Sequence, residues 1–586
     1  MRHPRILSMV AALGLVSAGM VTASASAAPA AVPLGAATGK DTNYVVLADQ
    51  GVSAQKVADD LEAKGATVTS VNEAVGLVIV SSDRANFAKS ARAMKGVYGA
   101  ATEGVVGRAP KRVAERNRDA IMRPRFESNN KGGKGKGNGH GRYKKGKKAD
   151  PLDHLLWGMD MLDVSAAHKI ESGDKRVKVG VMDTGVDASH PDIKPNFDRK
   201  LSRNFVTDMP DIDGPCETSN CVDPADVDEG GHGTHVAGTI AAAKNGMGVS
   251  GVAPDVSIVN VRAGQDSGYF FVGPVVNALT YSADAGLDVV NMSFYVDPWA
   301  YNCLDGAPED NDEAAQEQNL IIESMTRALT YAHKKNVTLV GALGNSYTDL
   351  ANPGTDTSSP DYPEGNEYPR TIDNATCFDL PVEGPHVIGV SSVGPTKRKA
   401  YYSNYTTDIH SGEIEVSAPG GDYRDHYGTD QYATPGNLIL STVPLKVLQE
   451  EGSVDADGNI TEDGEGWVLK DCRTTGKGKG SKTECGYYEY YQGTSMASPH
   501  AAGVAALIVS RFGRVQGKQG FTLDANRTRQ ILMGTAVDTP CPEPRLFTYP
   551  GLASRFNAEC VGGAAFNGFY GDGIVNAYEA MRFPRR

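Results

Sequence analysis

From residue 150 onward, short apolar segments alternate with longer segments of helical periodicity, and this alternation limits the possible folds more than any other feature. The apolar segments are RVKVGVMD, VSIVNVRA, DVVNMSF, VTLVGAL and HVIGVSSV, and helical segments such as HGTHVAGTIAAA and NLIIESMTRALTYAHKK separate them. Continuous apolar strands joined by helices form a parallel sheet that is covered on both faces. The sequence therefore predicts a doubly wound, mostly parallel α/β domain over residues 150–586.

Residues 42–106 show a different pattern and predict a separate small domain. A strand (NYVVLA), a helix (SAQKVADDLEAKG), two strands (TVTSV and GLVIVSS), a second helix (ANFAKSARAM) and a last strand (GVYGA) follow one another. This βαββαβ order is typical of a ferredoxin-like α+β unit. Its size is at the lower end of what folds alone.

Residues 107–149 form a basic segment rich in glycine and lysine. Residues 131–148 contain eight Lys and Arg and no acid, and subtracting them from the net charge of −13 leaves −21 on the rest of the chain. Such a segment cannot build a core and predicts a solvated linker. A nucleic-acid-binding arm is the alternative, but Tyr143 is the sole aromatic residue available for stacking on bases. We therefore expect no nucleic-acid partner.

Residues 1–27 have the pattern of a secretory signal peptide. Arg2 and Arg5 precede an apolar run, and Ala25-Ser26-Ala27 supplies the small residues of a cleavage site. A membrane anchor is the alternative. Gly, Ser and Thr interrupt the run, however, and no second apolar segment of spanning length follows. The sequence predicts a secreted, extracellular protein that is not held in a membrane.

The chain has eight cysteines, and an even number suits an oxidising compartment. Because loop closure favours near partners, we expect pairing in consecutive couples: Cys216–Cys221, Cys303–Cys377, Cys472–Cys485 and Cys541–Cys560. Eight cysteines allow 105 connectivities, so other pairings remain open. The double CxxC spacing of a zinc site does not occur.

Three motifs in the large domain supply the residue types of nucleophilic catalysis. They are VMDTGVD with Asp183, GHGTHVAGT with His232 and GTSMASPH with Ser495. A serine hydroxyl is a weak nucleophile until a base such as imidazole takes its proton. A buried carboxylate fixes the imidazole tautomer and stabilises the imidazolium. The three residues predict an Asp-His-Ser triad at the carboxyl ends of the strands.

In their order along the chain, these motifs resemble those of the subtilisin family of serine proteases. The resemblance covers most of residues 150–581, including the closing motif YGDGIVN at 570–576, and residues 42–106 resemble the family's inhibitory propeptide. It implies a serine endopeptidase that acts on proteins or peptides through an acyl-enzyme and needs no cofactor for the chemistry. It also implies a zymogen that processes itself and is inhibited by its own propeptide.

The segment VGALGNS matches the part of the family that carries the oxyanion asparagine, here Asn345. The resemblance implies that its amide and the backbone N–H of Ser495 bind the tetrahedral oxyanion, with Thr494 as a supporting hydroxyl. His235 and His500 lie inside the motifs. With His232 assigned as the base, we expect both to be structural.

The family binds extended peptides beside the segment after DVVNMSF, which implies substrate contacts by Ser293, Phe294 and Tyr295. The opposite wall of the pocket is expected from Ala342, Leu343 and Gly344. Tyr295 stands where the family has a small residue, and Leu343 where alanine is usual. We expect Leu343 to narrow the pocket, so the side-chain preference stays open.

The loop AKNGMGVSGVAP at 243–254 resembles the strong calcium loop of the family. The resemblance implies side-chain ligands from Asp150, Asp192 and Asn245 and carbonyl ligands from Met247 and Val249. This oxygen set suits a hard cation. The alternative is a glycine-rich turn with solvated acids.

Two insertions, 301–318 and 444–485, depart from the short family core. They either rim the cleft or decorate the surface. If they block one end of the cleft, the enzyme is a tripeptidyl exopeptidase. A further alternative is that the protein is not an enzyme but an inactive homologue that binds peptides. We expect a monomer.

Overall fold

The computed structural model describes residues 37–103, 149–363, 365–476, 481–517 and 520–584. The predicted signal peptide at 1–27 and all of the predicted linker at 107–149 except residue 149 lie outside the described residues.

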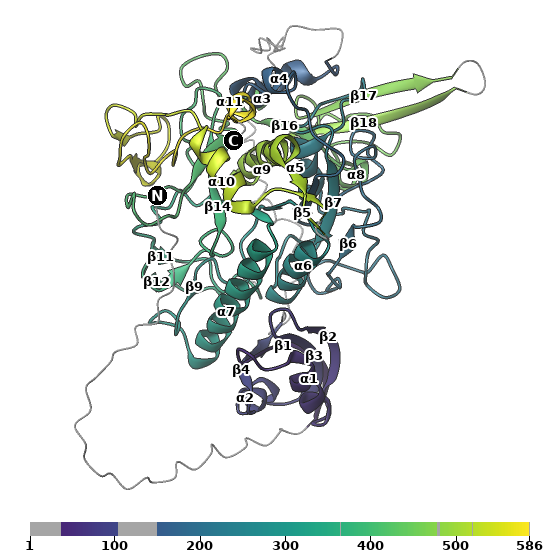
Figure 1. Cartoon of the computed structure of the whole chain (residues 1–586), viewed down its shortest axis with the longest axis vertical. Helices are drawn as coiled ribbons and strands as arrows, with labels where there is room; N and C mark the ends of the chain where they lie inside the picture. Colours follow the sequence, from purple (N-terminus) through teal and green to yellow (C-terminus); the bar gives the residue numbers. More distant parts are fainter. Residues whose placement is uncertain (1–36, 104–148, 364, 477–480, 518–519, 585–586) are drawn as a thin grey trace.

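A seven-stranded parallel sheet forms the centre of the large domain (Figure 1). Its strands follow the order β15 (Val416–Pro419), β14 (Val387–Val393), β10 (Thr338–Ala342), β8 (Val289–Met292), β5 (Lys178–Met182), β7 (Ser257–Arg262) and β6 (Arg203–Asn204). Every pair of neighbours in this sheet is parallel. All five predicted apolar segments form central strands, because each is buried on both faces.

Helices cover both faces of this sheet. On one face, α5 (His232–Ala241), α9 (Thr494–Phe512), α10 (Ala525–Gly534) and α11 (Ala577–Arg582) share a core with Val179 and Val340. On the other, α6 (Val272–Asp284) and α7 (Asp312–Lys334) pack against alternate strand residues such as Met182 and Val290. The doubly wound α/β prediction is confirmed.

The small domain has the predicted βαββαβ order. Its elements are β1 (Ala37–Ala48), α1 (Ala54–Glu62), β2 (Thr67–Asn72), β3 (Leu77–Arg84), α2 (Phe87–Arg92) and β4 (Val97–Thr102), in an antiparallel sheet of order β2-β3-β1-β4. The first strand begins at Ala37, before the expected boundary at 42, because it continues past an irregularity to pair with Arg84. One face of the sheet packs against α6 and α7, where Leu47 and Ala101 join the same core as Leu320 (Figure 1).

The two insertions contain regular structure. The first holds β9 (Asn302–Cys303), paired with β13 (Cys377–Phe378), and the first turns of α7. The second holds α8 (Leu445–Glu450), β17 (Val468–Thr475) and the start of β18 (Lys482–Tyr491). Strands β17 and β18 form a hairpin that projects from the domain (Figure 1), and β16 (Ile439–Thr442) pairs with its base.

The remaining elements are short. They are η1 (Asp153–Leu155), α3 (Trp157–Met161), α4 (Val164–Ala167), β11 (Gly354–Asp356), β12 (Arg370–Ile372), η2 (Pro435–Asn437), β19 (Arg514–Val515), β20 (Phe521–Thr522), β21 (Leu546–Phe547), η5 (Ser554–Phe556) and β22 (Ala558–Glu559).

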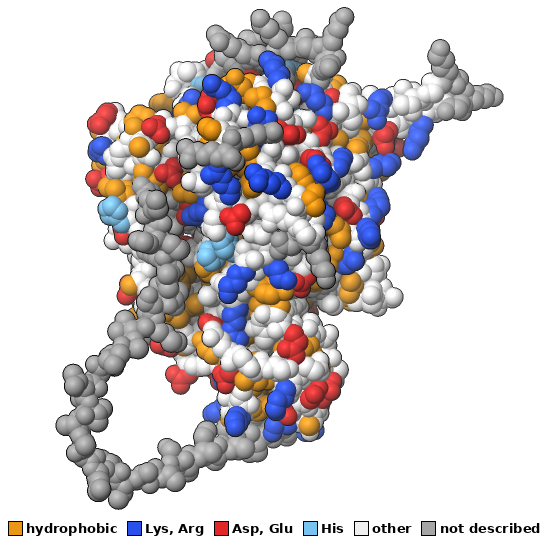
Figure 2. Space-filling view, in the orientation of Figure 1, with side chains coloured by type: hydrophobic (Ala, Val, Ile, Leu, Met, Phe, Trp, Pro, Cys, Tyr) orange, Lys and Arg blue, Asp and Glu red, His pale blue; other side chains and the backbone are white. Residues whose placement is uncertain are grey.

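All eight cysteines form disulfides, in the consecutive couples that loop closure favours. Two of them join directly paired strands: Cys303–Cys377 links β9 to β13, and Cys472–Cys485 links β17 to β18. On the face shown in Figure 2, basic and acidic side chains are interspersed and hydrophobic ones form small separate groups. Within the described ranges, no helix combines the length and apolar character needed to span a bilayer.

Candidate active site

Asp183 follows directly after β5 and is fully buried. Its carbonyl oxygen accepts the N–H groups of Ala263 and Gly264, both at 3.1 Å, at the end of the neighbouring strand β7. Its Oδ1 accepts the N–H of Thr184 at 2.8 Å. The sheet therefore fixes the carboxylate at its carboxyl edge.

His232 is the first residue of α5, after Gly231, whose φ of 80° favours glycine. Its Nδ1 lies 2.7 Å from Oδ1 of Asp183, and its Nε2 is buried without a hydrogen-bond partner in the described chain. Burial alone lowers the pKa of His232, but the charges of Asp183 and Asp228 and the hydrogen bond to Asp183 outweigh it, and the pKa is raised. The free Nε2 is therefore placed to accept a proton.

Ser495 is the second residue of α9 and is 3% exposed. Its Oγ donates to the carbonyl of Ser293 at 3.2 Å, and among the described residues it makes no hydrogen bond to His232. Before its proton can pass to His232, the hydroxyl of Ser495 must break its hydrogen bond with the carbonyl of Ser293 and turn toward Nε2. The N-terminus of α9 adds a partial positive charge at the nucleophile. Pro499 lies inside the helix, past the expected first turn, and cannot donate to the carbonyl of Ser495, which accepts the hydroxyl of Ser293 instead.

Ser293 supports the nucleophile with its side chain. Its Oγ donates to the carbonyl of Ser495 at 3.2 Å and lies 2.8 Å from Oγ of Ser498. The residue is buried and its side chain contacts α9, while its contact with a substrate stays a prediction. Phe294 stacks on Phe270 with ring centroids 4.1 Å apart. Tyr295 is exposed, and its hydroxyl donates to Asp361 at 2.5 Å.

Asn345 and Thr494 lie together beside Ser495. Oδ1 of Asn345 accepts the backbone N–H of Thr494 at 2.8 Å and its hydroxyl at 2.9 Å. The Thr494 hydroxyl in turn accepts the N–H of Gly344 at 3.1 Å. Because both donors hold the amide oxygen, Nδ2 is the end of Asn345 that is left to donate.

The turn that carries Asn345 depends on Asn404, which sequence reasoning missed because nothing in its local pattern marks it. The amide of Asn404 donates to the carbonyl of Leu343 at 3.0 Å and accepts the N–H groups of Ser346 and Thr348, both at 3.0 Å. Gly344 has φ of +103°, and a Cβ there would lie 2.3 Å from Nδ2 of Asn404. Only glycine fits this position.

Leu343 does not narrow a pocket as expected. Its side chain is 0% exposed and belongs to a buried cluster with Tyr301, Leu350 and Ile414. Ala342, at the end of β10, is also buried. Leu343 lies one residue past the end of β10, and its side chain points into this core.

Asp228 is a second buried carboxylate of the site that sequence reasoning missed. Its Oδ1 accepts the hydroxyl of Thr184 and the N–H of Gly231, both at 2.9 Å. Its Oδ2 accepts the N–H of Thr234 at 2.8 Å and the hydroxyl of Thr234 at 2.5 Å. Asp228 therefore ties the segment after Asp183 to the first turn of α5. Four donors from three residues surround the carboxylate of Asp228, and no sequence motif indicates that they meet there.

The structure brings the expected calcium residues together. Oδ1 of Asp192 accepts from Nδ2 of Asn245 at 2.9 Å, and its Oδ2 accepts the N–H of Val249 at 3.2 Å. Asp150 accepts the N–H of Asn245 at 3.2 Å. Within the described chain, no hydrogen bond uses the carbonyl of Met247 or of Val249. These two carbonyls remain available to a cation.

The donor set fits a calcium ion. Oδ1 of Asn245 is buried without a hydrogen-bond partner in the described chain, and an orphaned acceptor of this kind suits a cation. Burial raises the pKa of Asp192 to about 7, although Tyr488 donates to it at 2.8 Å. Asp150 is buried as well. A divalent cation would offset the cost of burying these carboxylates.

Comparisons with known proteins agree with this geometry. Residues 174–573 match the model of the subtilase family. The chain is 27% identical over 406 residues to fervidolysin of Fervidobacterium pennivorans, covering 66% of this chain and 41% of that protein. It is 27% identical over 362 residues to subtilisin DY of Bacillus licheniformis, covering 62% of this chain and 84% of that protein.

Among solved structures, the epidermin leader peptide processing serine protease of Staphylococcus aureus superposes with a TM-score of 0.59 at 17% identity, covering 93% of this chain and 99% of that one. The match is evidence of a shared fold. The chain spans less than half of fervidolysin. The family match covers more than half of the chain, and it includes Asp183, His232 and Ser495. The chain belongs to the subtilase family of subtilisin-like serine proteases.

Proposed function

We propose that the protein is a secreted serine endopeptidase, made as a zymogen, that cleaves proteins or peptides through Ser495, His232 and Asp183. The observation that supports this most is the 2.7 Å contact between His232 and Asp183, with Nε2 of His232 left free. The proposed location outside the cell rests on the pattern of residues 1–27 and on the disulfides.

In the proposed reaction, Nε2 of His232 takes the proton of Ser495 as Oγ attacks the scissile carbonyl. Asp183 holds the imidazole through Nδ1 and stabilises the imidazolium. The backbone N–H of Ser495 and Nδ2 of Asn345 donate to the oxyanion. His232 then gives the proton to the leaving amine, and a water molecule repeats these steps to release the acyl group from Ser495.

Hydrolysis of casein with and without a serine-reactive fluorophosphonate tests this function. We expect cleavage that the reagent abolishes, with one reagent molecule bound to Ser495. Intact casein together with an unlabelled Ser495 would instead favour an inactive peptide-binding homologue. Mass spectrometry of the products of a long peptide separates internal cleavage from the release of tripeptides.

The pH dependence of kcat/KM follows from the raised pKa of His232. The base must be neutral, so activity falls as the pH drops through this pKa. Since the pKa lies above the ordinary value of about 6.5, half-maximal activity on the acid side is expected above that pH. Asp228→Asn removes one of the charges that raise it, and should move the acid limb to lower pH. An unmoved limb in this variant would show that Asp228 does not act on His232.

We propose further that the small domain is the inhibitor of the same chain. Arg327 of α7 donates to the carbonyls of Ala48 at 2.8 Å and Val75 at 3.1 Å. Arg92 of α2 forms two hydrogen bonds with Glu313 at 2.6 and 2.7 Å. Arg327 and Glu313 both belong to α7, so these contacts hold the small domain on the helix that precedes β10.

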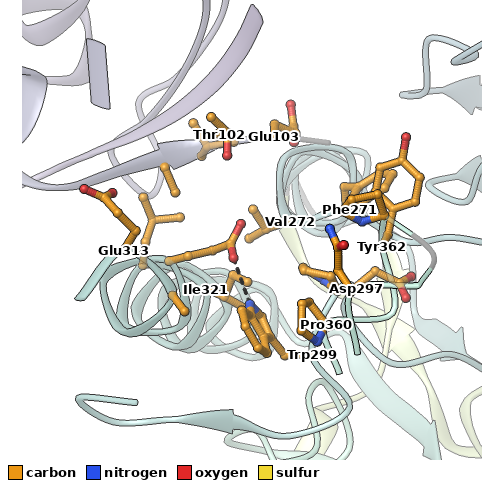
Figure 3. A pocket seen from close by; sticks show the side chains of 18 of the residues that line it. Thr102, Glu103, Phe271, Val272, Asp297, Trp299, Glu313, Ile321, Pro360 and Tyr362 are labelled. Carbon is orange, nitrogen blue, oxygen red and sulfur yellow. Dashed lines mark hydrogen bonds between the residues drawn. The ribbon is translucent and has the colours of Figure 1, made fainter. Parts of the chain in front are cut away.

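The last described residues of the small domain reach the start of α6. Glu103 accepts the N–H of Gly273 at 2.8 Å, next to a cavity of about 280 Å³ between the two domains. Figure 3 shows Thr102 and Glu103 on one side of this cavity and Trp299 and Pro360 on the opposite side. Nε1 of Trp299 donates to Glu317, which also lines the cavity, at 2.9 Å. The described part of the small domain therefore ends against the large domain, beside this cavity.

Arg327→Ala should weaken the hold of the small domain. Hydrogen bonds to a charged donor contribute about 1.5–3 kcal/mol, which corresponds to a loss of affinity of roughly 10- to 100-fold. The lag before activity appears in freshly refolded full-length chain is expected to shorten. Lys335→Ala, at the exposed C-terminal end of the same helix, is the control and should keep the normal lag. An unchanged lag in both variants contradicts the inhibitory role.

Removing calcium should destabilise the protein. Measured in the Ser495→Ala background to prevent autolysis, EDTA is expected to lower Tm, since a ligand at 100 times its Kd contributes about 2.7 kcal/mol. In Asp192→Asn the EDTA-dependent drop should be smaller, whereas Asp457→Asn, at an exposed carboxylate, should behave like the parent. Equal drops in all three chains would show that Asp192 does not hold the ion.

A further inference from the structure

Asp379 carries a buried carboxylate that takes no part in the proposed reaction steps. The residue follows directly after β13 and is 9% exposed. Its backbone is held in a turn, because its N–H donates to a carboxylate oxygen of Glu383 at 2.6 Å and its carbonyl accepts the N–H of Glu383 at 2.8 Å. Among the described residues, its own carboxylate oxygens accept no hydrogen bond and join no ion pair. The side chain therefore lacks the partner that a buried carboxylate needs.

The carboxylate of Asp379 lies against the turn that carries Asn345. Its Oδ2 is 3.4 Å from the position that a Cβ on Gly344 would occupy, and Gly344 directly precedes Asn345. Gly344 belongs to one of the two walls that the sequence predicts for the substrate pocket, and Nδ2 of Asn345 is the proposed donor to the oxyanion. Asp379 is therefore close to the place where the carbonyl of the scissile bond is expected.

The segment of Asp379 also contacts the opposite predicted wall, residues 293–295. The carbonyl of Leu380, the next residue, accepts the N–H of Val296 at 2.8 Å, directly after that wall. On the other side of Asp379, strand β13 pairs with β9, and the disulfide Cys303–Cys377 links the two strands. Asp379 thus lies on a braced segment that contacts both walls between which a substrate side chain is expected.

No positive charge of the described residues compensates Asp379. Burial raises the pKa of its carboxyl group well above the ordinary value, and neither a charge nor a hydrogen bond opposes this effect. Arg370, the fully buried cation of the preceding strand β12, is already bound to Asp310 at 2.9 Å and to Asp356 at 3.0 Å. An isolated buried carboxylate is costly, and a cation that binds it removes much of the cost.

We propose that Asp379 binds the cationic side chain of the substrate residue that precedes the scissile bond, so that the enzyme cleaves after lysine or arginine. This inference rests on the proposed function. The carbonyl that Asn345 binds belongs to that substrate residue, so its side chain is the one nearest to Gly344 and Asp379. Lysine and arginine have long apolar stems that carry the charge to a buried partner. Since both oxygens of Asp379 are unused, a guanidinium can bind both at once.

Protonation is the competing way to remove the charge of Asp379. A neutral carboxyl group would give lysine no advantage over an uncharged side chain of the same length. A bound lysine or arginine instead keeps the carboxylate ionised, because an opposite charge close by lowers its pKa. Separating a buried, hydrogen-bonded charge pair is expensive, so substrates without the cation should react far more slowly. The two possibilities therefore predict different substrate preferences.

The test is kcat/KM for fluorogenic peptides that differ only in the residue before the scissile bond: arginine, lysine, norleucine, phenylalanine or glutamate. It is measured on refolded full-length chain once activity has appeared. Norleucine has the stem of lysine without the charge, and we expect lysine and arginine to exceed it by about 10²- to 10³-fold. Asp379→Asn should remove most of this preference by slowing the basic peptides, with little effect on phenylalanine. Asp373→Asn, at an exposed acid of the turn before β13, should keep it.

Fluorophosphonate labelling of Ser495 separates a failure of this inference from a failure of the proposed function. An unmodified chain that is labelled and cleaves peptides, but does not prefer lysine to norleucine, would overturn the inference in favour of protonation. This comparison does not depend on the folding of any variant. Equal lysine-to-norleucine ratios in the unmodified and Asp379→Asn chains would overturn it as well. A chain that is neither labelled nor active would overturn the proposed function, and this inference with it.

Discussion

Replacing Ser495 with alanine is expected to abolish casein hydrolysis and to leave the full-length precursor uncut. In subtilisin itself, loss of the nucleophile lowers kcat by about 10⁶-fold, and a similar loss is expected here. Ser495 is 3% exposed at the start of α9, so the change removes a single hydrogen bond, to the carbonyl of Ser293. The fold should survive. The precursor is followed by gel electrophoresis and mass spectrometry after refolding.

Ser510→Ala is the matched control for this experiment. Ser510 lies on the same helix, donates to the carbonyl of Ala506 at 2.8 Å and accepts the N–H of Asp174 at 3.1 Å, so its change removes at least as many hydrogen bonds far from the nucleophile. This chain should process itself and hydrolyse casein. A product of mature size from the Ser495→Ala chain, expressed without other proteases, would show that processing is not carried out by this serine.

The parts of the fold and site that could be predicted from sequence are those that depend on short, continuous segments of the chain. Each central strand is a continuous apolar run because parallel strands under two layers of helices are buried on both faces. Asp183, His232 and Ser495 each lie inside a short motif at the end of a strand or the start of a helix. Local pattern was sufficient for these residues.

What could not be predicted depends on contacts between distant segments. Asn404 holds the turn at Gly344 from a position about sixty residues later in the chain. The side chain of Leu343 points into the core, because the direction of a residue just past a strand depends on how the strand ends. Tyr488 reaches Asp192 from β18, 296 residues later in the chain. The sequence of a single segment does not indicate these long-range contacts.

Asn345→Ala is expected to lower kcat by about 10²- to 10³-fold, a loss of roughly 3–4 kcal/mol that is known for the corresponding donor in subtilisin. KM should change little, because the amide donates to the oxyanion and not to the bound substrate. Steady-state kinetics on a peptide substrate measures both constants. Self-cleavage of the precursor uses the same oxyanion, so it should slow by a similar factor.

Thr494 provides a finer test of the same arrangement. Its hydroxyl donates to Oδ1 of Asn345 at 2.9 Å and accepts the N–H of Gly344 at 3.1 Å. Thr494→Val removes both contacts but keeps the shape, and a lost hydrogen bond of about 1–1.5 kcal/mol should reduce kcat by roughly tenfold. Thr494→Ser keeps the hydroxyl and should restore most of the rate. If valine and serine gave equal kcat values, the orientation of Asn345 would depend on its contact with the backbone N–H of Thr494 alone.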